Sequence, residues 1–408
     1  MAARIETIGV VGAGTMGAGI AQLAVVAGFE TLLHDPVEGA VEKAAGDIED
    51  LLNKGAGRGR WSEDDAAAAI ARLSPAAELE DLAGCGLIIE AVPEDLELKR
   101  SLFADLTALL ADSALLATNT SSISVTAIAA TTPRPQRVVG MHFFNPPPRM
   151  RLLEIVAGDE TSVETVASAR EVGERMGRTP IDAADGIGFL ANRLARPYTL
   201  ESLRMVAEGF EVETIDAVCR TLGGFRMGPF ELIDLVGVDV NLGVAKSFWE
   251  QSFHEPRWQP SPIQQRLVDA GRLGRKSGRG FYDYRDGPHR PDDKPDPPPS
   301  APPLGEILTG ATPGWVRDRE EEILGRILAG IVNEAYFAFS AGVGSIADSN
   351  TAMRLGFNWP RGPFEWAEAI GHARALAILD VMQRERGEER YRAAPALRAL
   401  AASAANLT

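Results

Sequence analysis

A histidine, a glutamate and a serine lie at or near the ends of predicted strands, and together they could move a proton. His142 ends the apolar run 138–142, Glu154 is the single carboxylate of the run 151–156, and Ser121 follows the run 115–118. Histidine is the usual general base near neutral pH, and a neighbouring carboxylate would orient its ring and stabilise the imidazolium. The serine hydroxyl would hold the reacting oxygen. Because open α/β sheets bind ligands at the carboxyl ends of parallel strands, we expect these side chains to serve one site.

Each of these residues also has a purely structural interpretation. His142 could cap a loop, and Glu154 could face solvent on an edge strand. Ser121 and Ser122 could cap the helix that we expect to begin near Val125, and for Ser122 this is the preferred interpretation. The joint placement of His142, Glu154 and Ser121 beside a predicted dinucleotide site favours the functional interpretation for these three.

The elements that must position these side chains begin with a glycine-rich turn. The apolar run 5–11 leads directly into Gly12-Ala13-Gly14-Thr15-Met16-Gly17, and a small-residue helix is predicted over 15–27. In such a turn the first glycine permits a tight bend, the second lets the backbone approach a pyrophosphate, and the third lets the helix pack against the strand. The phosphates would then lie at the helix N-terminus, where free N–H groups and the helix dipole favour an anion. Gly12, Gly14, Thr15, Met16 and Gly17 are therefore candidate cofactor contacts.

Asp35 indicates which dinucleotide is bound. It closes the next apolar stretch, eighteen residues after Gly17, where a carboxylate should accept from the ribose 2′-hydroxyl. A carboxylate there repels a 2′-phosphate, and the following residues 36–38 offer no cation. The sequence therefore predicts NAD rather than NADP. The alternative is a glycine-rich turn in some other α/β protein.

The first part of the chain alternates strand and helix patterns. Strands are predicted over 5–11, 30–34, 87–92, 115–118, 138–142 and 151–156, and helices over 15–27, 41–52, 64–73 and 96–110. Between the second and third of these helices lies a basic turn, 53–60. This alternation predicts an α/β Rossmann domain with a doubly wound, mostly parallel sheet.

Long helical patterns dominate after about residue 186, and they occur twice. Leu190-Ala191-Asn192-Arg193-Leu194 matches Ile323-Leu324-Gly325-Arg326-Ile327 at an offset of 133 residues, and Gly228-Pro229-Phe230-Glu231 matches Gly362-Pro363-Phe364-Glu365. Between the copies, eight of the sixteen residues 288–303 are proline, which predicts an extended linker. We predict four segments: an NAD-binding domain over 1–186, a catalytic helical domain over 187–285, a linker over 286–310 and a duplicated helical domain over 311–408.

Composition excludes several classes of protein. The 408 residues carry a formal net charge of −16 and no basic run, which argues against a nucleic-acid partner. The two cysteines, Cys85 and Cys219, make no disulfide framework, so a reducing, cytoplasmic compartment is expected. Four residues before the first strand leave no room for a signal peptide, and we expect no membrane-spanning run. No cluster of metal ligands is evident, so no metal is predicted.

Several motifs make the chain similar to the L-3-hydroxyacyl-CoA dehydrogenases over roughly residues 5–284. They are Gly-x-Gly-x-Met-Gly at 12–17, Asn119-Thr120-Ser121-Ser122, His142-Phe143-Phe144-Asn145-Pro146, Gly188-Phe189-Leu190-Ala191-Asn192-Arg193, Gly228-Pro229-Phe230-Glu231 and Lys276-Ser277-Gly278-Arg279-Gly280-Phe281-Tyr282. The spacing agrees with that family as well as the residue types. The resemblance implies NAD-dependent interconversion of a (3S)-3-hydroxyacyl-CoA and a 3-oxoacyl-CoA.

The same resemblance assigns roles to residues. It makes His142 the general base and Glu154 its partner, while Ser121 and Asn192 contact the reacting oxygen and hold the substrate. Besides the glycine turn and Asp35, the implied cofactor contacts are Glu94, Lys99, Ser121, Asn145 and Lys276. The implied CoA contact is Lys54, with Arg58 and Arg60 nearby, because cations suit the CoA phosphates. A solvated basic turn is the alternative for these three cations.

The second helical copy has Gly325 where the first has Asn192, so we expect it to be structural. In family members with a duplicated helical domain, the extra copy replaces a partner subunit's domain. The resemblance therefore implies either a monomer with an intramolecular pseudo-dimer of helical domains, or a homodimer.

Two other functions compete with this one. A related NAD-dependent dehydrogenase could act on a small 3-hydroxy acid without CoA, although the basic turn near Lys54 weighs against it. An inactive NAD-binding scaffold is disfavoured because Ser121, His142, Glu154 and Asn192 are all intact.

Overall fold

The glycine turn joins a strand to a helix in the computed structural model, which describes residues 5–290 and 319–405. β1 (Thr7–Val11) leads into Gly12, whose φ of 102° lies in the left-handed region, and α1 (Thr15–Val26) follows. A Cβ atom on Gly12 would lie 2.6 Å from the carbonyl oxygen of Ala91, and one on Gly17 would lie 1.7 Å from that of Gly12. Only glycine fits these two positions, since the neighbouring backbone atoms cannot yield.

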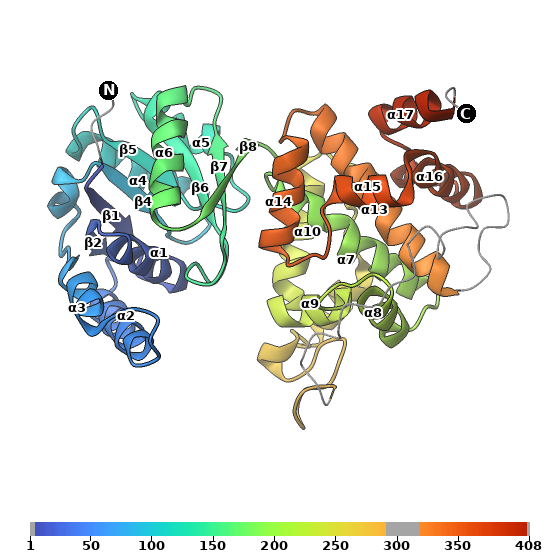
Figure 1. Ribbon diagram of the computed structural model, residues 1–408, viewed down its shortest axis with the longest axis horizontal. Coiled ribbons are helices and arrows are strands. Elements are labelled where there is room, and N and C mark those ends of the chain that lie inside the picture. The colour runs from blue at the N-terminus through green and yellow to red at the C-terminus, as the bar shows by residue number, and fades with distance from the viewer. Residues whose placement is uncertain (1–4, 291–318, 406–408) are drawn as a thin grey trace. The chain divides into compact units, whose positions relative to one another are not determined.

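The chain divides into two compact units between Phe189 and Leu190. The first unit contains an eight-stranded sheet in the order β3-β2-β1-β4-β5-β6-β7-β8 (Figure 1). Besides β1, its strands are β2 (Glu30–His34), β3 (Leu73–Pro75), β4 (Leu87–Glu90), β5 (Leu115–Thr118), β6 (Val138–Phe143), β7 (Leu152–Ala157) and β8 (Thr179–Ala184). Neighbouring strands are parallel except for β6 and β7, which are antiparallel. This mostly parallel sheet confirms the predicted Rossmann fold class.

Helices cover both faces of the sheet. They are α1, α2 (Ala40–Ala56), α3 (Glu63–Ala71), α4 (Leu96–Leu109), α5 (Val125–Ala129) and α6 (Val163–Arg175), with 3₁₀ turns η1 (Leu79–Gly84) and η2 (Pro135–Arg137). On one face, alternate strand residues such as Val139 and Met141 share a buried core with side chains of α1, α2, α3 and α6. Gly140, between them, points to the other face, where an added Cβ would lie 3.0 Å from Val125 of α5. This alternation follows from the period of two along a strand.

The second unit is helical and repeats one order of elements. Its first copy contains α7 (Ala191–Ala207), α8 (Val212–Thr221), α9 (Pro229–Val236), α10 (Val238–Gln251), η3 (Pro256–Trp258), α11 (Pro262–Asp269) and η4 (Arg275–Ser277). The second contains α13 (Arg319–Ser340), α14 (Ile346–Gly356), α15 (Pro363–Ile370), α16 (His372–Arg386), η5 (Glu389–Tyr391) and α17 (Pro395–Ala405). Both α9 and α15 begin with an N-cap glycine, a proline at the first turn and a glutamate, Glu231 or Glu365, that accepts from the N-cap backbone N–H. The equivalent caps make equivalent helices begin at equivalent residues.

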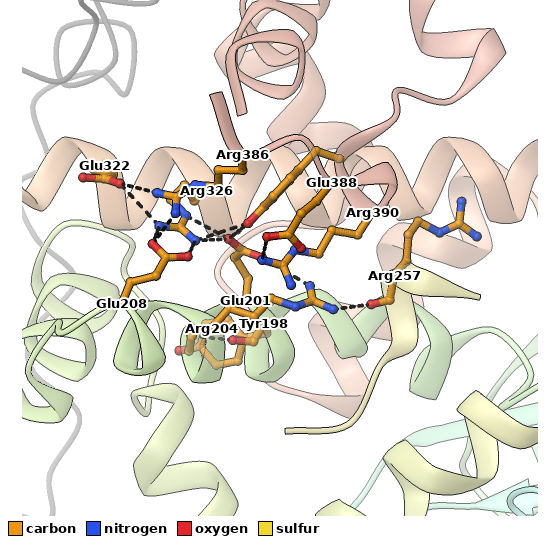
Figure 2. A network of polar contacts seen from close by, with 12 residues as sticks. Tyr198, Glu201, Arg204, Glu208, Arg257, Glu322, Arg326, Arg386, Glu388 and Arg390 are labelled. Atoms are coloured by element: carbon orange, nitrogen blue, oxygen red, sulfur yellow. Dashed lines mark hydrogen bonds and ion pairs between the residues drawn. The ribbon is translucent and has the colours of Figure 1, made fainter. Parts of the chain in front are cut away.

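Helix α13 bears on the expectation that no run spans a membrane. By length and composition it could cross a membrane, although no such run was predicted. However, 78% of its most apolar window is buried inside the protein, which is the environment of a core helix. It packs along α7, and Arg326 of α13 contacts Glu201 in α7 and Glu208 at its end (Figure 2).

Several local predictions were wrong. The edge strand β3 and the strand β8 were not predicted. Helix α2 continues to Ala56, so Lys54 lies in its last turn rather than in the basic turn. The cap of α5 is Ser124, whose hydroxyl accepts from the backbone N–H of Ala127, and not Ser122. A cap must immediately precede the first helical residue, and only Ser124 does. Residues 291–310 of the predicted linker lie outside the described residues.

Candidate active site

His142 and Glu154 face each other across the antiparallel strand pair. They are register partners in β6 and β7, and His142 Nδ1 lies 2.6 Å from Glu154 Oε2. Both side chains are almost fully buried, with 8% and 0% of their area exposed. A carboxylate can only accept, so Nδ1 carries the shared proton and Nε2 is the ring nitrogen left to act as a base. The proton-transfer pair predicted from the sequence is thus brought together in the first unit.

Aromatic rings and a backbone contact fix the position of this histidine. Phe144 and Phe189 lie beside the ring, with centroid distances of 4.6 and 5.7 Å. Phe189 has a φ of 49°, an uncommon conformation for a bulky residue. At the end of β6, the backbone N–H of Phe143 donates to Asn119 Oδ1 at 2.8 Å. This bond ties the histidine strand to the loop after β5.

The loop after β5 is organised by Glu94. Its Oε1 accepts from the backbone N–H groups of Ser121 and Ser122 at 2.9 and 3.0 Å, and from the Thr120 hydroxyl at 2.7 Å. The Ser121 hydroxyl lies farther away, at 3.4 Å. Burial raises the pKa of Glu94, but the hydrogen bond from Thr120 and the charge of Lys99 more than offset this, so the pKa lies below its ordinary value. Glu94 therefore holds the backbone that carries Ser121 while remaining charged.

Lys99 is buried beneath this loop. Its Nζ lies 2.5 Å from Glu90 Oε1 and 3.4 Å from Glu94 Oε2, with only 1% of the side chain exposed. The other oxygen of Glu90 accepts from the Thr118 hydroxyl at 2.7 Å. The sequence resemblance makes Lys99 a cofactor contact, whereas these distances show a buried cation that joins the ends of β4 and β5 through two carboxylates.

The glycine turn is shaped to receive a dinucleotide. Gly14 is exposed, and a Cβ added to it would meet nothing within 4 Å. No acidic residue lies in the first turn of α1, and no side chain caps it, so its first N–H groups are available to an anion. Asp35 Oδ2 accepts from the backbone N–H of Ala13 at 2.7 Å, and Oδ1 accepts from Val37 at 2.9 Å. The end of β2 is thereby joined to the turn, beside the point where the strand order reverses between β1 and β4.

Two of the predicted site residues belong to the second unit. Asn192 is the second residue of α7, and its half-buried side chain makes no hydrogen bond to any described residue. Lys276 Nζ donates to Asp239 Oδ2 at 2.7 Å, beside the first turn of α10. Asn145 lies in the first unit, where it is exposed and precedes Pro146 through a cis peptide bond.

The predicted CoA cations lie at the surface of the first unit. Lys54 pairs with Asp50 at 3.1 Å, and 64% of its side chain is exposed. Arg58 and Arg60 are exposed in the turn after α2, and neither makes an ion pair with a described residue. Trp61 anchors this turn by donating from its indole Nε1 to the carbonyl oxygen of Leu52 at 2.9 Å. Two free guanidinium groups are thus held on an anchored turn.

Some residues of the site were missed from the sequence. Glu90 was not singled out, and Thr118 was placed in a candidate segment without a role of its own, although each ends a buried strand at the carboxyl edge of the sheet, which was a usable signal. Asp185 was also missed: it accepts from the Ser124 hydroxyl and from the backbone N–H groups of Val125 and Thr126. No local pattern links it to residues 60 positions away.

Comparison with known proteins matches both units to one family. Residues 7–186 match the family model of the 3-hydroxyacyl-CoA dehydrogenase NAD binding domain. Residues 188–284 and again 323–406 match that of the 3-hydroxyacyl-CoA dehydrogenase C-terminal domain. The second model thus covers both helical copies.

Individual proteins agree with these matches. The chain is 37% identical to 3-hydroxyadipyl-CoA dehydrogenase of Escherichia coli K12, with 98% of each chain covered. It is 40% identical to 3-hydroxybutyryl-CoA dehydrogenase of Mycobacterium tuberculosis over 70% of this chain and all of that one. The crystal structure of 3-hydroxybutyryl-CoA dehydrogenase from Escherichia coli K12 superposes with a TM-score of 0.89 at 35% identity, covering 99% of this chain and 100% of that one.

Proposed function

The chain belongs to the 3-hydroxyacyl-CoA dehydrogenase family and oxidises a 3-hydroxyacyl-CoA with NAD, and we propose which of its side chains perform this reaction. His142 is the general base, and Glu154 is its positioning partner. The observation that carries this assignment is the 2.6 Å contact between His142 Nδ1 and Glu154 Oε2.

Oxidation of a secondary alcohol breaks two bonds. The hydroxyl oxygen loses its proton, and the carbon that bears this oxygen loses a hydride. NAD, when bound, accepts the hydride. Nε2 of His142 takes the hydroxyl proton, and the carboxylate of Glu154 stabilises the imidazolium that results. In the reverse direction, the same imidazolium returns the proton to the 3-oxo group. The aromatic rings of Phe144 and Phe189 limit access of water to the ring, which strengthens its interaction with Glu154.

Ser121 and Asn192 hold the reacting oxygen. The support for Ser121 is the loop that Glu94 fixes at the carboxyl end of β5. The support for Asn192 is its unused amide group at the first turn of α7. An amide N–H and a hydroxyl are suitable donors for an oxygen that gains negative charge in the transition state of the reverse reaction.

The bound dinucleotide contacts the glycine turn, and Asp35 selects NAD. Gly12, Gly14, Thr15, Met16 and Gly17 hold the pyrophosphate at the start of α1, and Asn145 and Lys276 are further contacts. Glu94 and Lys99 act mainly by organising the loop next to the cofactor, as their buried contacts support.

The substrate is a short-chain acyl thioester of CoA. The relatives named above act on 3-hydroxybutyryl and 3-hydroxyadipyl groups, which have four and six carbons. Arg58 and Arg60, exposed and free of ion pairs with described residues, bind CoA phosphates, and Lys54 contributes from the end of α2. These cations disfavour the alternative of a small 3-hydroxy acid without CoA.

The two helical copies act as domains over 187–285 and 311–408, and the second replaces a partner subunit's domain. The support is the packing of α13 along α7 and the repeated match to one family model. The protein is thus a monomer with an internal pseudo-dimer. The two buried free thiols, Cys85 and Cys219, are consistent with a reducing cytoplasm.

One assay tests this function. NADH absorbance is followed with acetoacetyl-CoA, with longer 3-oxoacyl-CoA substrates and with a free 3-oxo acid, and in the other direction with the matching hydroxy compounds. We expect turnover of the thioesters alone. Turnover of the free acid at equal or greater kcat/KM would favour the CoA-free alternative, and binding of NADH with no turnover of any substrate would favour the scaffold.

A further inference from the structure

One arginine of the helical unit is buried without an anion. Arg196 in α7 is only 5% exposed, and its Nη1 has no hydrogen-bond partner among the described residues. Its Nε approaches the backbone carbonyl oxygen of Asn192 at 3.4 Å, and its guanidinium carbon lies 5.7 Å from the centroid of the Phe248 ring. Burial lowers the pKa of Arg196 to about 10, which still leaves the group charged at neutral pH. A charged group in this position is unfavourable unless a counterion binds it.

The other buried arginine among the described residues, Arg326, is paired with carboxylates. Arg326, 2% exposed, contacts the carboxylates of Glu201, Glu208 and Glu322 (Figure 2). Arg196 contacts none. The described residues therefore supply carboxylate partners where an arginine serves the packing of α7 against α13, and they supply none for Arg196.

Comparison of the two helical copies links Arg196 to Asn192. The positions equivalent to Asn192 and Arg196 in α13 hold Gly325 and Ala329. The helix forms and packs in both copies, so its fold does not require an arginine at this position. The amide and the guanidinium are present together in one copy and absent together from the other, which is the pattern expected of two groups that bind the same molecule.

We propose that Arg196 binds the terminal carboxylate of a dicarboxylic acyl chain, so that the enzyme prefers 3-hydroxydicarboxylyl-CoA substrates such as 3-hydroxyadipyl-CoA to monocarboxylic ones. This inference rests on the proposed role of Asn192. A guanidinium group matches a carboxylate with two parallel hydrogen bonds.

The spacing suits a six-carbon chain. Residues four apart in a helix lie on the same face and about 6 Å apart along the axis. In a 3-hydroxyadipyl group the terminal carboxyl carbon lies three carbon–carbon bonds beyond C3, roughly 4 Å away when extended. A substrate held at its C3 oxygen by Asn192 would therefore bring its carboxylate to Arg196. A hexanoyl chain would place a methyl group there and leave the cation without an anion.

The test compares 3-hydroxyadipyl-CoA with 3-hydroxyhexanoyl-CoA, which has the same carbon chain and no terminal charge. Wild-type enzyme, Arg196→Met and Arg196→Lys are assayed for kcat and KM with each substrate. We expect Arg196→Met to lower kcat/KM for the adipyl substrate by about 10²-fold, mostly through KM, and to leave the hexanoyl substrate unchanged or improved. Arg196→Lys should recover part of the loss, because it keeps the charge without the planar fork. Arg272→Met, which removes an exposed cation from the same unit, should not change the ratio.

The outcomes separate this inference from the proposed function. Equal losses with both substrates would overturn it, since a structural role or binding of a CoA phosphate would affect both alike. A wild-type enzyme that oxidises the hexanoyl substrate as well as or better than the adipyl one would also overturn it, with the proposed function intact. Turnover of neither substrate would overturn both. Activity of Arg196→Met with the hexanoyl substrate shows that the variant is folded.

Discussion

Arg326 of the second helical copy donates to Glu201 of the first, from Nε to Oε1 at 2.8 Å, with both side chains almost completely buried. The reciprocal contact also exists: Arg193 Nε donates to Glu334 Oε1 at 2.8 Å. Arg193 corresponds to Arg326 in the duplication, and Glu201 corresponds to Glu334. Two ion pairs whose members are equivalent in the two copies are characteristic of a two-fold interface, and here that interface is formed within one chain.

Removal of the second copy should expose this interface. A chain truncated after Arg290 lacks α13, so the face of α7 that holds Glu201 and Arg193 loses its cover. We expect the truncated chain to self-associate or aggregate more than the full chain, as measured by light scattering. A truncated chain that stays monomeric, soluble and fully active would contradict the substitution of a partner domain by the second copy.

The buried ion pair predicts a specific dependence of stability on pH. Burial raises the pKa of Glu201, but Arg326 and Arg204 outweigh it and lower the pKa to about 2. A carboxyl with a lowered pKa contributes stability above its unfolded value, about 4.3, and loses that contribution as the pH falls through its folded value. Arg326→Met should therefore lower the free energy of unfolding at pH 7 by about 3–5 kcal/mol, because it leaves buried carboxylates unpaired.

The difference in the free energy of unfolding between wild type and Arg326→Met should shrink as the pH falls from about 5 to about 2, through the unfolded and then the folded pKa of Glu201, because a protonated Glu201 needs no cation. Chemical denaturation at several pH values measures it. Arg354→Met provides the control: Arg354 pairs with Glu365 but is 54% exposed, so its loss should cost less than about 1 kcal/mol. If the loss of unfolding free energy caused by Arg326→Met is the same at every pH, the ionisation of Glu201 does not account for it.

The catalytic pair is tested by a double-mutant cycle. His142→Gln should lower kcat by about 10²–10⁴, the usual contribution of a general base, with little change in NADH affinity. If Glu154 acts through His142, the double variant with Glu154→Gln should be about as slow as the slower single variant. Multiplicative effects would place Glu154 elsewhere, as a contributor to stability. A His142→Gln enzyme with more than half of the wild-type kcat would remove His142 from the mechanism.

Glu94 should act on kcat rather than on cofactor binding. Glu94→Gln keeps one acceptor oxygen but loses the charge that holds Ser121, Ser122 and Thr120, so we expect kcat to fall by about 10-fold with KM for NAD nearly unchanged. Glu97→Gln is the control, because Glu97 lies in the first turn of α4, just after the loop that holds Glu94, and 80% of its side chain is exposed; it should have no effect. An increase in KM for NAD at constant kcat would instead make Glu94 a direct cofactor contact.

Cofactor choice should depend on Asp35. The wild-type enzyme should prefer NAD to NADP in kcat/KM, and Asp35→Ser should narrow that preference by removing the charge that repels a 2′-phosphate. Serine keeps an acceptor for the Ala13 N–H, and Glu38→Gln removes a nearby exposed carboxylate as a control. Equal wild-type efficiency with both cofactors would refute the role of Asp35.

The local parts of the fold could be predicted from sequence because their signals are local. The glycine turn and the strand 30–34 follow from a few neighbouring residues, and so do the two strands that carry His142 and Glu154. The strand β3 is only three residues long and ends in proline, and β8 has few β-branched residues, so neither gives a strong pattern. The antiparallel register that sets His142 opposite Glu154 depends on how two strands pair, and two partners of Arg326, Glu201 and Glu208, lie more than 100 positions away. Such contacts come from tertiary packing, which no single segment encodes.

Near the pseudo-two-fold axis, Pro197 meets Gly330, its counterpart in the other copy: a Cβ added to Gly330 would lie 3.3 Å from Cβ of Pro197. In a homodimer the two subunits have the same sequence, so each substitution occurs on both sides of the axis. A proline near the axis therefore contacts the same proline of the partner subunit. In this chain each substitution is inherited once. One side can therefore carry glycine and the other proline, just as one copy carries Asn192 and Arg196 and the other carries Gly325 and Ala329. Two copies within one chain thus leave the two halves of a symmetric interface free to differ from each other as surfaces.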